Sequence, residues 1–373
     1  MRDAWQIGRL FGIPLRIHVS WLIVFGLVSW SLAAGYFPAQ LPDLPVWSYW
    51  AKAIVAAAMF FASLILHELG HSLVARRHGV GIASITLFVF GGVSQMREEP
   101  RTPRQEFEIA AIGPAISLAL AGVFAVIGSW TRVDGASTGT SVVMVYLATV
   151  NLLLAIFNLL PAFPLDGGRV LRAALWYFKA NLVQATQAAA RVSSLLAFGL
   201  IALGLLQLFS GNFGGVWLAL IGWFIRQAGT SAATQVSLRE TLAGLRVRDV
   251  MIADPKAVDA REPVTGLIED YFARYTYGGY PVERNGEIVG LVTLHDVSKI
   301  QPAERSRTPV EQIMSPLTPE LVVAADTPVF QALTRMLSTN AGRLVVLDGG
   351  GRAGLVTSRG ILHLAQMKTA FGS

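Results

Sequence analysis

The sequence predicts a polytopic α-helical membrane protein, with about six transmembrane helices and a membrane-associated β-hairpin, followed by a soluble α/β module. Three observations predict this class. Hydrophobic residues make up 53% of the 373 residues and charged residues only 14%, whereas about 25% is usual in soluble domains. The apolar residues gather in long runs, and after about Gln235 charges, prolines and turn dipeptides take over. Cysteine is absent, which excludes disulfides and thiol chemistry.

The apolar runs are long enough to cross a bilayer, which takes about 20 residues of helix. The predicted spans are Val19–Tyr36, Ala53–Ala75, Ile109–Trp130, Val142–Leu160, Val192–Phe209 and, as the shortest, Val216–Ile225. Lys and Arg concentrate in alternate connections, whereas "GYFPAQLPDLPVWSYW" and "SGNFGG" carry few or none. The positive-inside rule therefore predicts that both termini are cytoplasmic. The net charge of +6 is then explained by loops that face an anionic bilayer, so no nucleic-acid partner is expected.

The stretch "LHELGHSLVARRHG", residues 66–79, places three ionisable side chains at the cytoplasmic end of the second span. Positions i and i+4 share one face of a helix, so His67 and His71 point the same way, as zinc ligation requires. Glu68 completes an HExxH arrangement, in which the glutamate is the general base. Each ionisable group inside a span costs at least ~2.5–3.5 kcal/mol, which a bound dication would offset. The alternative is that the three residues merely mark the end of the span.

A catalytic zinc site takes three protein ligands, so one ligand is missing from this stretch. His67 lies about 14 residues, a rise of about 21 Å, from the outer end of its span. The fourth span runs in the same direction and continues as "NLLPAFPLDGGRVLRA", which brings Asp166 to the same side. Asp166 is the predicted third ligand; its alternative is an N-cap of a helix that starts near Gly168, and the two roles can coexist. Asn158 would either donate a hydrogen bond to an oxyanion or pack between helices.

The segment "SITLFVFGGVSQM", residues 84–96, has strand-like composition and is predicted to form a hairpin with a Gly-Gly turn. A hairpin near the metal would pair with an unwound substrate by strand addition, which exposes the peptide bonds that a helix hides. The predicted substrate contacts are Gly91, Gly92 and Val93. The alternative is a plain connecting hairpin.

The polar C-terminal part contains an internal repeat. "VRDVMIADPKAV" matches "VEQIMSPLTPELV", and the Gly-Leu-Val-Thr sequence at 290–293 recurs at 354–357, 64 residues later. Each copy has a β-α-β-β-α pattern, and Asn285-Gly286 marks a hairpin turn in the first copy. The repeat therefore predicts two copies of one small α/β fold.

These motifs resemble two known families. "HELGH" at 67–71 and "NLLPAFPLDGGR" at 158–169 are similar to the two signatures of the site-2 protease family of intramembrane zinc metalloproteases. "AAIGPAISLALAG" at 110–122 and "FGG" at 90–92 are also similar to features of that family. The repeat resembles a pair of cystathionine-β-synthase (CBS) domains. The expected organisation is a protease domain at 1–230, a linker at 231–244 and CBS domains at 245–303 and 304–368.

The protease resemblance implies one catalytic Zn2+ bound by His67, His71 and Asp166, with Glu68 activating water. Asn158 matches the family's asparagine and is implied in catalysis. The expected substrate is another membrane-spanning protein, cut in or near its transmembrane segment during regulated signalling. The expected location is the cell membrane of a bacterium or archaeon.

The CBS resemblance implies that an adenine nucleotide (ATP, ADP or AMP) binds between the repeats. Thr293 and Asp296 match nucleotide-binding positions in the first repeat, and Thr357 does so in the second, where Gly360 replaces the acid. One nucleotide site or none is expected, because Asp296 is equally well explained as a helix cap. CBS modules tend to pair between chains, which predicts a homodimer.

Two other function classes compete with a protease. In a CBS-gated ion transporter or channel, the same His, Glu and Asp residues would line an ion path. A catalytically inactive membrane scaffold is the third class, against which the intact Glu68 argues. An HExxH motif on one helix, with a third ligand after a proline break, favours hydrolysis over both alternatives.

Overall fold

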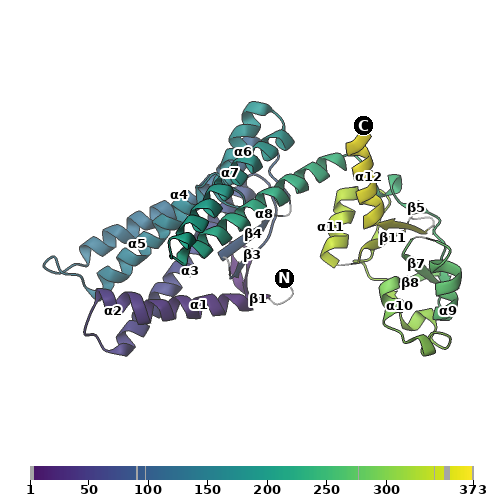
Figure 1. Ribbon diagram of the computed structural model, residues 1–373, viewed down its shortest axis with the longest axis horizontal. Coiled ribbons are helices and arrows are strands. Elements are labelled where there is room, and N and C mark those ends of the chain that lie inside the picture. Colours follow the sequence, from purple (N-terminus) through teal and green to yellow (C-terminus); the bar gives the residue numbers. More distant parts are fainter. Residues whose placement is uncertain are drawn as a thin grey trace. The chain divides into compact units, whose positions relative to one another are not determined.

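The computed structural model describes residues 4–371, except 90, 97, 276, 340 and 348–352. The chain divides into two compact units, Met1–Val236 and Ser237–Ser373. The first unit is built of long helices with one small sheet, and the second is a mixture of short strands and helices (Figure 1).

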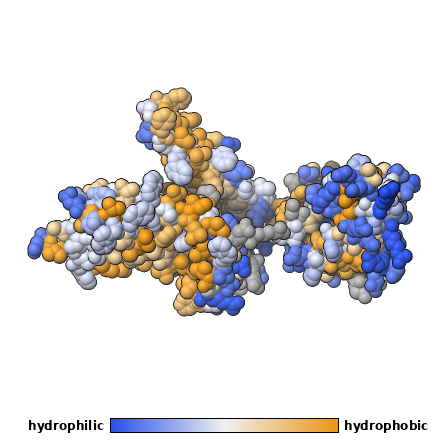
Figure 2. All heavy atoms as spheres, turned by 90° about the horizontal axis from the view of Figure 1, so that it is seen from below, coloured by the Kyte–Doolittle hydropathy of each residue, from blue (hydrophilic) through white to orange (hydrophobic). Residues whose placement is uncertain are grey.

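Five helices of the first unit are long and apolar enough to cross a membrane. The first, α1 (Val19–Ser31), continues through a π-helical turn into α2 (Phe37–Gln40). The other four are α3 (Val46–Arg77), α4 (Pro103–Trp130), α5 (Gly139–Asn158) and α7 (Leu182–Phe209). Apolar side chains cover much of the surface of this unit (Figure 2), as is expected of helices that face lipid.

The expected count of six spans is not confirmed. The sixth predicted span lies in α8 (Gly214–Thr241), a 28-residue helix that is not among the five apolar helices. Its apolar segment ends at Ile225, because Arg226 and a polar sequence follow within the same helix. The helix has the length of a span, but the run of apolar residues is too short for the hydrocarbon core.

Local sequence explains where the helices around the site begin and end. Pro45 precedes the first residue of α3, and Gly79 adopts φ +76° just beyond its end. Thr102 caps α4 by accepting a hydrogen bond from the Gln105 N–H, and Thr138 forms a capping box at the start of α5. After α5 the prolines of residues 159–165 prevent the helix from continuing, and α6 (Asp166–Lys179) starts at once.

A four-stranded sheet lies beside the helices in the first unit. Its order is β1 (Ala4–Leu10), β2 (Ile13–His18), β3 (Ile82–Phe88) and β4 (Gly91–Met96). The β1–β2 and β3–β4 pairs are antiparallel, and β2 pairs with β3 in parallel. The hairpin is therefore half of a larger sheet, and β4 is one of its edges.

The predicted Gly-Gly turn of this hairpin is wrong. Gly91 and Gly92 are the first residues of β4 and pair with Phe88 and Leu87, so the chain has reversed before Gly91. Gly91 has φ +122°, a conformation that glycine adopts without strain. Phe90, the first residue of the "FGG" motif, lies outside the described residues.

The second unit contains two four-stranded sheets, one around each repeat. One has the order β6-β7-β8-β9 and the other β10-β11-β12-β5. Their strands are β5 (Ile252–Ala253), β6 (Val258–Asp259), β7 (Gly279–Arg284), β8 (Glu287–Thr293), β9 (Ser315–Pro316), β10 (Val322–Val323), β11 (Arg343–Leu347) and β12 (Ala353–Thr357). Thus β5 belongs to the first repeat but joins the sheet of the second, and β9 belongs to the second repeat but joins the sheet of the first.

The helices of the second unit complete the predicted β-α-β-β-α pattern in each repeat. They are α9 (Val264–Gly266), which continues as a π-helix to Phe272, and α10 (Leu294–Ser298), α11 (Val329–Thr339) and α12 (Ser358–Phe371). Asn285 and Gly286 connect β7 to β8 with φ values of +54° and +81°, as a tight hairpin turn of two residues requires.

Candidate metal centre

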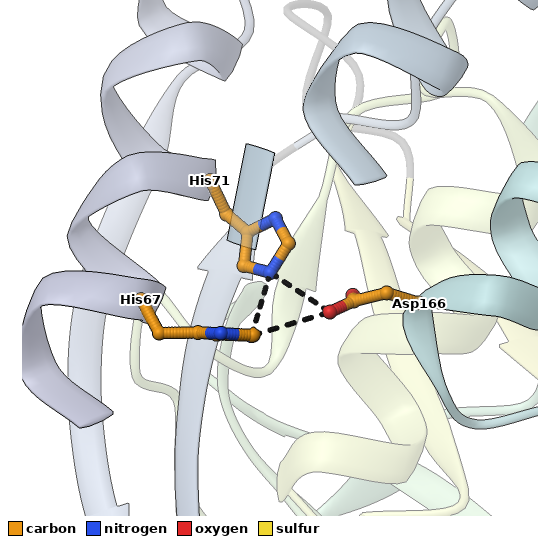
Figure 3. A group of neighbouring side chains, drawn as sticks. All are labelled: His67, His71 and Asp166. Carbon is orange, nitrogen blue, oxygen red and sulfur yellow. Dashed lines mark hydrogen bonds and ion pairs between the residues drawn. The ribbon is translucent and has the colours of Figure 1, made fainter. Parts of the chain in front are cut away.

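Three side chains converge between α3 and the start of α6 (Figure 3). The Nε2 atoms of His67 and His71 are 3.2 Å apart, and each is 3.2 Å from Asp166 Oδ2. The side chains are only 3%, 5% and 12% exposed, respectively. Atoms bound tetrahedrally at about 2.0–2.1 Å from one zinc ion are about 3.3 Å apart, so this triangle has the size that zinc requires.

The outer ring nitrogens of both histidines have partners on α4. His71 Nδ1 lies 2.6 Å from the Ile109 carbonyl oxygen, which can only accept, so this nitrogen carries the proton. His67 Nδ1 lies 2.9 Å from Ser117 Oγ. The Nε2 lone pair of His71 is therefore left to face the centre. This is the usual arrangement of metal-binding histidines, whose second nitrogen is held by a neighbouring group.

Gly113 allows α4 to come this close to both imidazole rings. A Cβ added at Gly113 would lie 2.6 Å from His67 Nε2 and closer still to His71 Nε2. Real Cβ atoms do not make such contacts, so any side chain here would displace the rings. Gly113 belongs to the "AAIGPAIS" motif, for which the sequence alone indicated no role.

Asp166 is the first residue of α6, and Leu165 is the N-cap. The alternative interpretation of Asp166 as a helix cap near Gly168 is therefore wrong. The tight turn before Asp166 requires glycine at the next two positions, because the backbone of the turn leaves no room for a side chain there. A Cβ on Gly168 would lie 2.5 Å from the Ala162 carbonyl carbon, and a Cβ on Gly167 would collide with the Leu159 carbonyl. The turn is also tied to α7, because Ser193 Oγ accepts a 2.9 Å hydrogen bond from the Phe163 N–H.

Glu68 is half-buried and lies against the edge of the sheet. Its Oε2 accepts a 3.1 Å hydrogen bond from the backbone N–H of Ser94 in β4. A second link supports this contact, since the Ser72 and Ser94 hydroxyls are 2.8 Å apart. A Cβ on Gly92 would lie 2.5 Å from Glu68 Cγ, so β4 approaches Glu68 as closely as a glycine permits. The sequence pattern did not reveal the role of Ser94.

The other predicted substrate-site residues lie on two elements. Gly91 is in contact range of Leu64 in α3, and Val93 is half-buried and pairs with Thr86 of β3. Asn158 is the last residue of α5 and is half-buried. Within the described ranges, its side chain makes no hydrogen bond. Only Gly92 of these residues is thus in direct contact with the HExxH motif.

A buried ion pair next to the centre was missed by the sequence reasoning. Glu106 of α4 is 1% exposed, and its Oε1 accepts hydrogen bonds from Arg172 of α6 through Nε, at 2.7 Å, and Nη2. Arg172 also lies over the ring of Phe163, 5.6 Å from its centroid. Glu106 lies in the polar first turns of α4 beside Arg104 and Glu108, so the sequence does not distinguish it from an exposed acid.

In the second unit, a cavity of about 1030 Å³ contains all three predicted nucleotide-binding residues. Asp296 Oδ2 accepts hydrogen bonds from the Thr293 N–H, at 3.0 Å, and from Thr293 Oγ1, at 2.7 Å. These two residues form a capping box at the start of α10, so the capping role of Asp296 is present. Thr357 and Gly360 line the same cavity, together with the cationic residues Lys299, Arg343 and Arg359.

Comparison with known families agrees with these two parts of the chain. The model of Peptidase family M50 matches residues 55–133 and 131–202, which include the histidines and Asp166. The CBS domain model matches residues 247–302 and 310–366.

Proteins similar over their full length carry related names. The chain is 40% identical to the putative zinc metalloprotease Rip3 of Mycobacterium tuberculosis, covering 98% of this chain and 93% of that protein. It is 31% identical to the putative zinc metalloprotease sll0528 of Synechocystis, over 99% and 97% of the two chains. A solved site-2 protease from Methanocaldococcus jannaschii aligns at 30% identity and a TM-score of 0.42, covering 62% of this chain and 95% of that one. The chain therefore belongs to peptidase family M50, as a zinc metalloprotease that carries two CBS domains.

Proposed function

We propose that this protein hydrolyses a peptide bond in or near a transmembrane segment of another membrane protein, and that an adenine nucleotide in the CBS cavity regulates it. The observation that carries the proposal is the buried triangle of His67 Nε2, His71 Nε2 and Asp166 Oδ2, with sides of 3.2 Å. These residues would hold one zinc ion. Zinc bound there supplies Lewis-acid activation of water and of the scissile carbonyl at neutral pH.

The donor set fits a cation better than a set of ordinary hydrogen bonds. His71 Nδ1 is committed to the Ile109 carbonyl, so the neutral ring presents a lone pair at Nε2. That lone pair faces a second imidazole nitrogen and a carboxylate oxygen. The His71 lone pair and the Asp166 carboxylate oxygen are both acceptors, and in a buried site they repel unless a positive charge lies between them.

Glu68 is the proposed general base. Its Oε2 is fixed by the Ser94 N–H, while Oε1 accepts no hydrogen bond from the described residues and is free to take the proton of the attacking water. The same carboxylic acid then gives this proton to the leaving amide nitrogen. Because Oε2 is held by the sheet, the Glu68 side chain is already oriented with Oε1 toward the water. Less side-chain rotamer freedom is then lost when the reaction occurs.

The proposed substrate path runs along the free edge of β4. The Ser94 N–H points away from β3, because Glu68 of α3 is its acceptor, and backbone groups alternate in direction along a strand. An unwound substrate segment that adds to this edge would pass beside Glu68, with Gly91, Gly92 and Val93 in contact. Asn158, whose amide has no partner in the described chain, is proposed to donate to the oxyanion of the scissile peptide.

The proposed orientation places the metal centre toward the cytoplasmic side of a multi-pass cell-membrane protein. Arg76 and Arg77 form the last turn of α3, one to two helical turns beyond His71. Arg101 and Arg104 lie at the start of α4, next to the same end of α3. Such clusters are retained on the cytoplasmic side.

The nucleotide proposal rests on the cavity in the second unit. It combines a capped acid, Asp296, with two threonines and with cations that would attract phosphate. The competing interpretation as a CBS-gated ion channel has less support, because the full-length relatives are named zinc metalloproteases.

The decisive experiment uses the full-length protein in lipid nanodiscs with a single-span substrate. Wild type should contain one zinc per chain by elemental analysis and should cleave the substrate, and a chelator should stop cleavage. Glu68→Gln should keep its zinc and lose cleavage. Glu98→Gln, an exposed site with 56% of its side chain accessible, is the matched control and should behave as wild type. Cleavage by Glu68→Gln would overturn the mechanism, and wild type without zinc would overturn the ligand set.

A further inference from the structure

Arg169 is a largely buried cation whose hydrogen-bonding capacity is mostly unused. It lies in the first turn of α6, three residues after Asp166, with its side chain 20% exposed. A guanidinium has five N–H donors, yet the described residues offer Arg169 no oxygen within hydrogen-bonding distance. Its Nη2 donates one hydrogen bond to Met96 Sδ, at 4.0 Å, and its Nε lies 4.0 Å from Glu106 Oε1. Burying donors without acceptors is unfavourable, so an acceptor that binds there would relieve this cost.

The negative charge of Glu106 does not explain why Arg169 is buried beside it. Arg172 already binds Glu106 through two nitrogens and stands in a one-to-one ion pair with it. Burial lowers the pKa of the Arg169 guanidinium, while the carboxylates of Glu106, Asp166 and Glu68 act in the opposite direction. Arg169 therefore keeps its charge close to the metal centre without belonging to any tight pair.

The position of Arg169 relative to β4 indicates what it could bind. Side chains alternate along a strand, so Ser94 and Met96 face the same side of the sheet. Ser94 contacts the HExxH helix through Ser72, and Met96 contacts Arg169. Glu68 therefore contacts β4 at Ser94 and Arg169 contacts it at Met96, two residues and about 6.7 Å further along the strand.

We propose that Arg169 is a substrate-binding residue, whose guanidinium donates hydrogen bonds to an oxygen of the substrate chain about two residues from the scissile bond. The inference rests on the proposed strand addition to β4. The oxygen belongs to a main-chain carbonyl or to an acidic side chain of the substrate; both present negative charge to the fork of an arginine.

The test measures substrate binding separately from cleavage. Full-length protein carrying Glu68→Gln is placed in nanodiscs, and the Kd of a fluorescent single-span substrate is compared with and without Arg169→Gln. Loss of hydrogen bonds to a charged group should raise Kd about 10- to 100-fold. Arg169→Lys should recover part of the loss, because it restores the charge but not the fork. Arg104→Gln, at a side chain that is 88% exposed, is the control and should leave Kd unchanged.

Two further measurements separate this role from a structural one. Zinc content and the thermal unfolding midpoint should be the same in Arg169→Gln as in its parent. An unchanged Kd in Arg169→Gln overturns the proposal, and so does a loss of zinc or a fall in the midpoint that accompanies the change in Kd. With Glu68 restored, Arg169→Gln should lower kcat/KM by a similar factor.

Variation of the substrate identifies the acceptor. If it is an acidic side chain, changing that residue to its amide weakens binding to the parent protein but not to Arg169→Gln. If it is a main-chain carbonyl, amide scanning has no effect, and a thioamide at one position weakens binding instead. Failure of the proposed function has a different signature: wild type would bind the substrate in an Arg169-dependent way and leave it uncut.

Discussion

The backbone N–H of Ser94 donates a 3.1 Å hydrogen bond to Glu68 Oε2, which joins the edge of a β-sheet to the motif helix. This contact places the HExxH glutamate within the reach of any chain that extends the sheet. Glu68 and Ser94 are 26 residues apart in sequence. They meet because β4 approaches α3 closely at Gly92, where an added Cβ would lie 2.5 Å from Glu68 Cγ.

Gly92→Ala should separate β4 from Glu68, because the new Cβ would lie 2.5 Å from Glu68 Cγ. Misplacing a catalytic group by about 1 Å can cost about 100-fold in rate, so we expect kcat/KM to fall by 10- to 100-fold. Zinc content should be unaffected, since the ligands lie elsewhere. The measurement is steady-state cleavage in nanodiscs with metal analysis, and Gln95→Ala, at an exposed residue of the same strand, is the control. Full activity in Gly92→Ala would show that the contact is not required.

Gly113→Ala should abolish metal binding. The added Cβ would lie 2.6 Å from His67 Nε2 and nearer to His71 Nε2, so the rings must move apart. Gly122→Ala is a matched control on the same helix, because no atom lies within 4 Å of its Cβ position. Elemental analysis should find less than one zinc per chain in the first variant and wild-type zinc in the second. Equal zinc in both would contradict the close packing described at Gly113.

Ser117→Ala should weaken zinc binding without unfolding the protein. It removes the oxygen 2.9 Å from His67 Nδ1 that holds the ring in orientation. Loss of such a supporting group typically costs 10- to 100-fold in metal affinity, so the apparent Kd should rise by about that factor. Competition with a chromophoric chelator measures it. Ser129→Ala, at an exposed serine of the same helix, should leave the affinity unchanged, and the same affinity in Ser117→Ala would remove Ser117 from the site.

Breaking the Glu106–Arg172 pair should destabilise the helical unit. With Arg172→Met, the 1% exposed carboxylate of Glu106 is left without its main partner, which typically costs about 3–5 kcal/mol. The double variant Glu106→Leu/Arg172→Met removes both charges and should recover much of that loss. Thermal unfolding in detergent measures the difference. A single variant as stable as wild type would show that the pair is not important for stability.

Asp296→Ala should reduce the affinity for an adenine nucleotide by about 10-fold or more, because hydrogen bonds to a charged acceptor are among the stronger ones. Titration calorimetry of the full-length protein with ATP, ADP and AMP measures the change. Because Asp296 also caps α10, the thermal midpoint must be followed in parallel. Asp270→Ala, an exposed acid in the same repeat with 55% of its side chain accessible, should bind as wild type. If Asp296→Ala binds ATP as tightly as wild type, then Asp296 acts only as a helix cap.

The residues that sequence reasoning could assign to the metal centre are those that follow local rules. His67 and His71 share a face because of helical periodicity, and Asp166 follows a proline break at a depth that counting along the span can estimate. The supporting residues obey no local rule. Gly113 and Ser117 matter only because α4 packs across the histidines, and nothing in "AAIGPAIS" indicates the register of that packing.

The sheet of the first unit was only half predictable. β3 and β4 form a hairpin that composition reveals. β1 and β2 were not predicted, although Ile13, Leu15 and Ile17 alternate with Pro14, Arg16 and His18 along β2. Their place depends on the parallel pairing of β2 with β3, between Leu15 and Ile85, which are 70 residues apart. The turn was misplaced because Gly-Gly usually marks a turn, whereas here close approach to Glu68 is what requires Gly92.

In the second unit, each repeat lends a strand to the other: β5 pairs with β12, and β9 pairs with β8. A gene that encoded one repeat alone would specify a sheet that lacks its edge strand. It would also specify one strand, β5 or β9, whose pairing partner is missing. The two repeats can therefore be inherited only as a pair, because neither sheet is complete without both. Recombination can add, remove or transfer the pair as a whole. A break in the chain between residues 253 and 315 leaves two fragments that must associate before either sheet is complete.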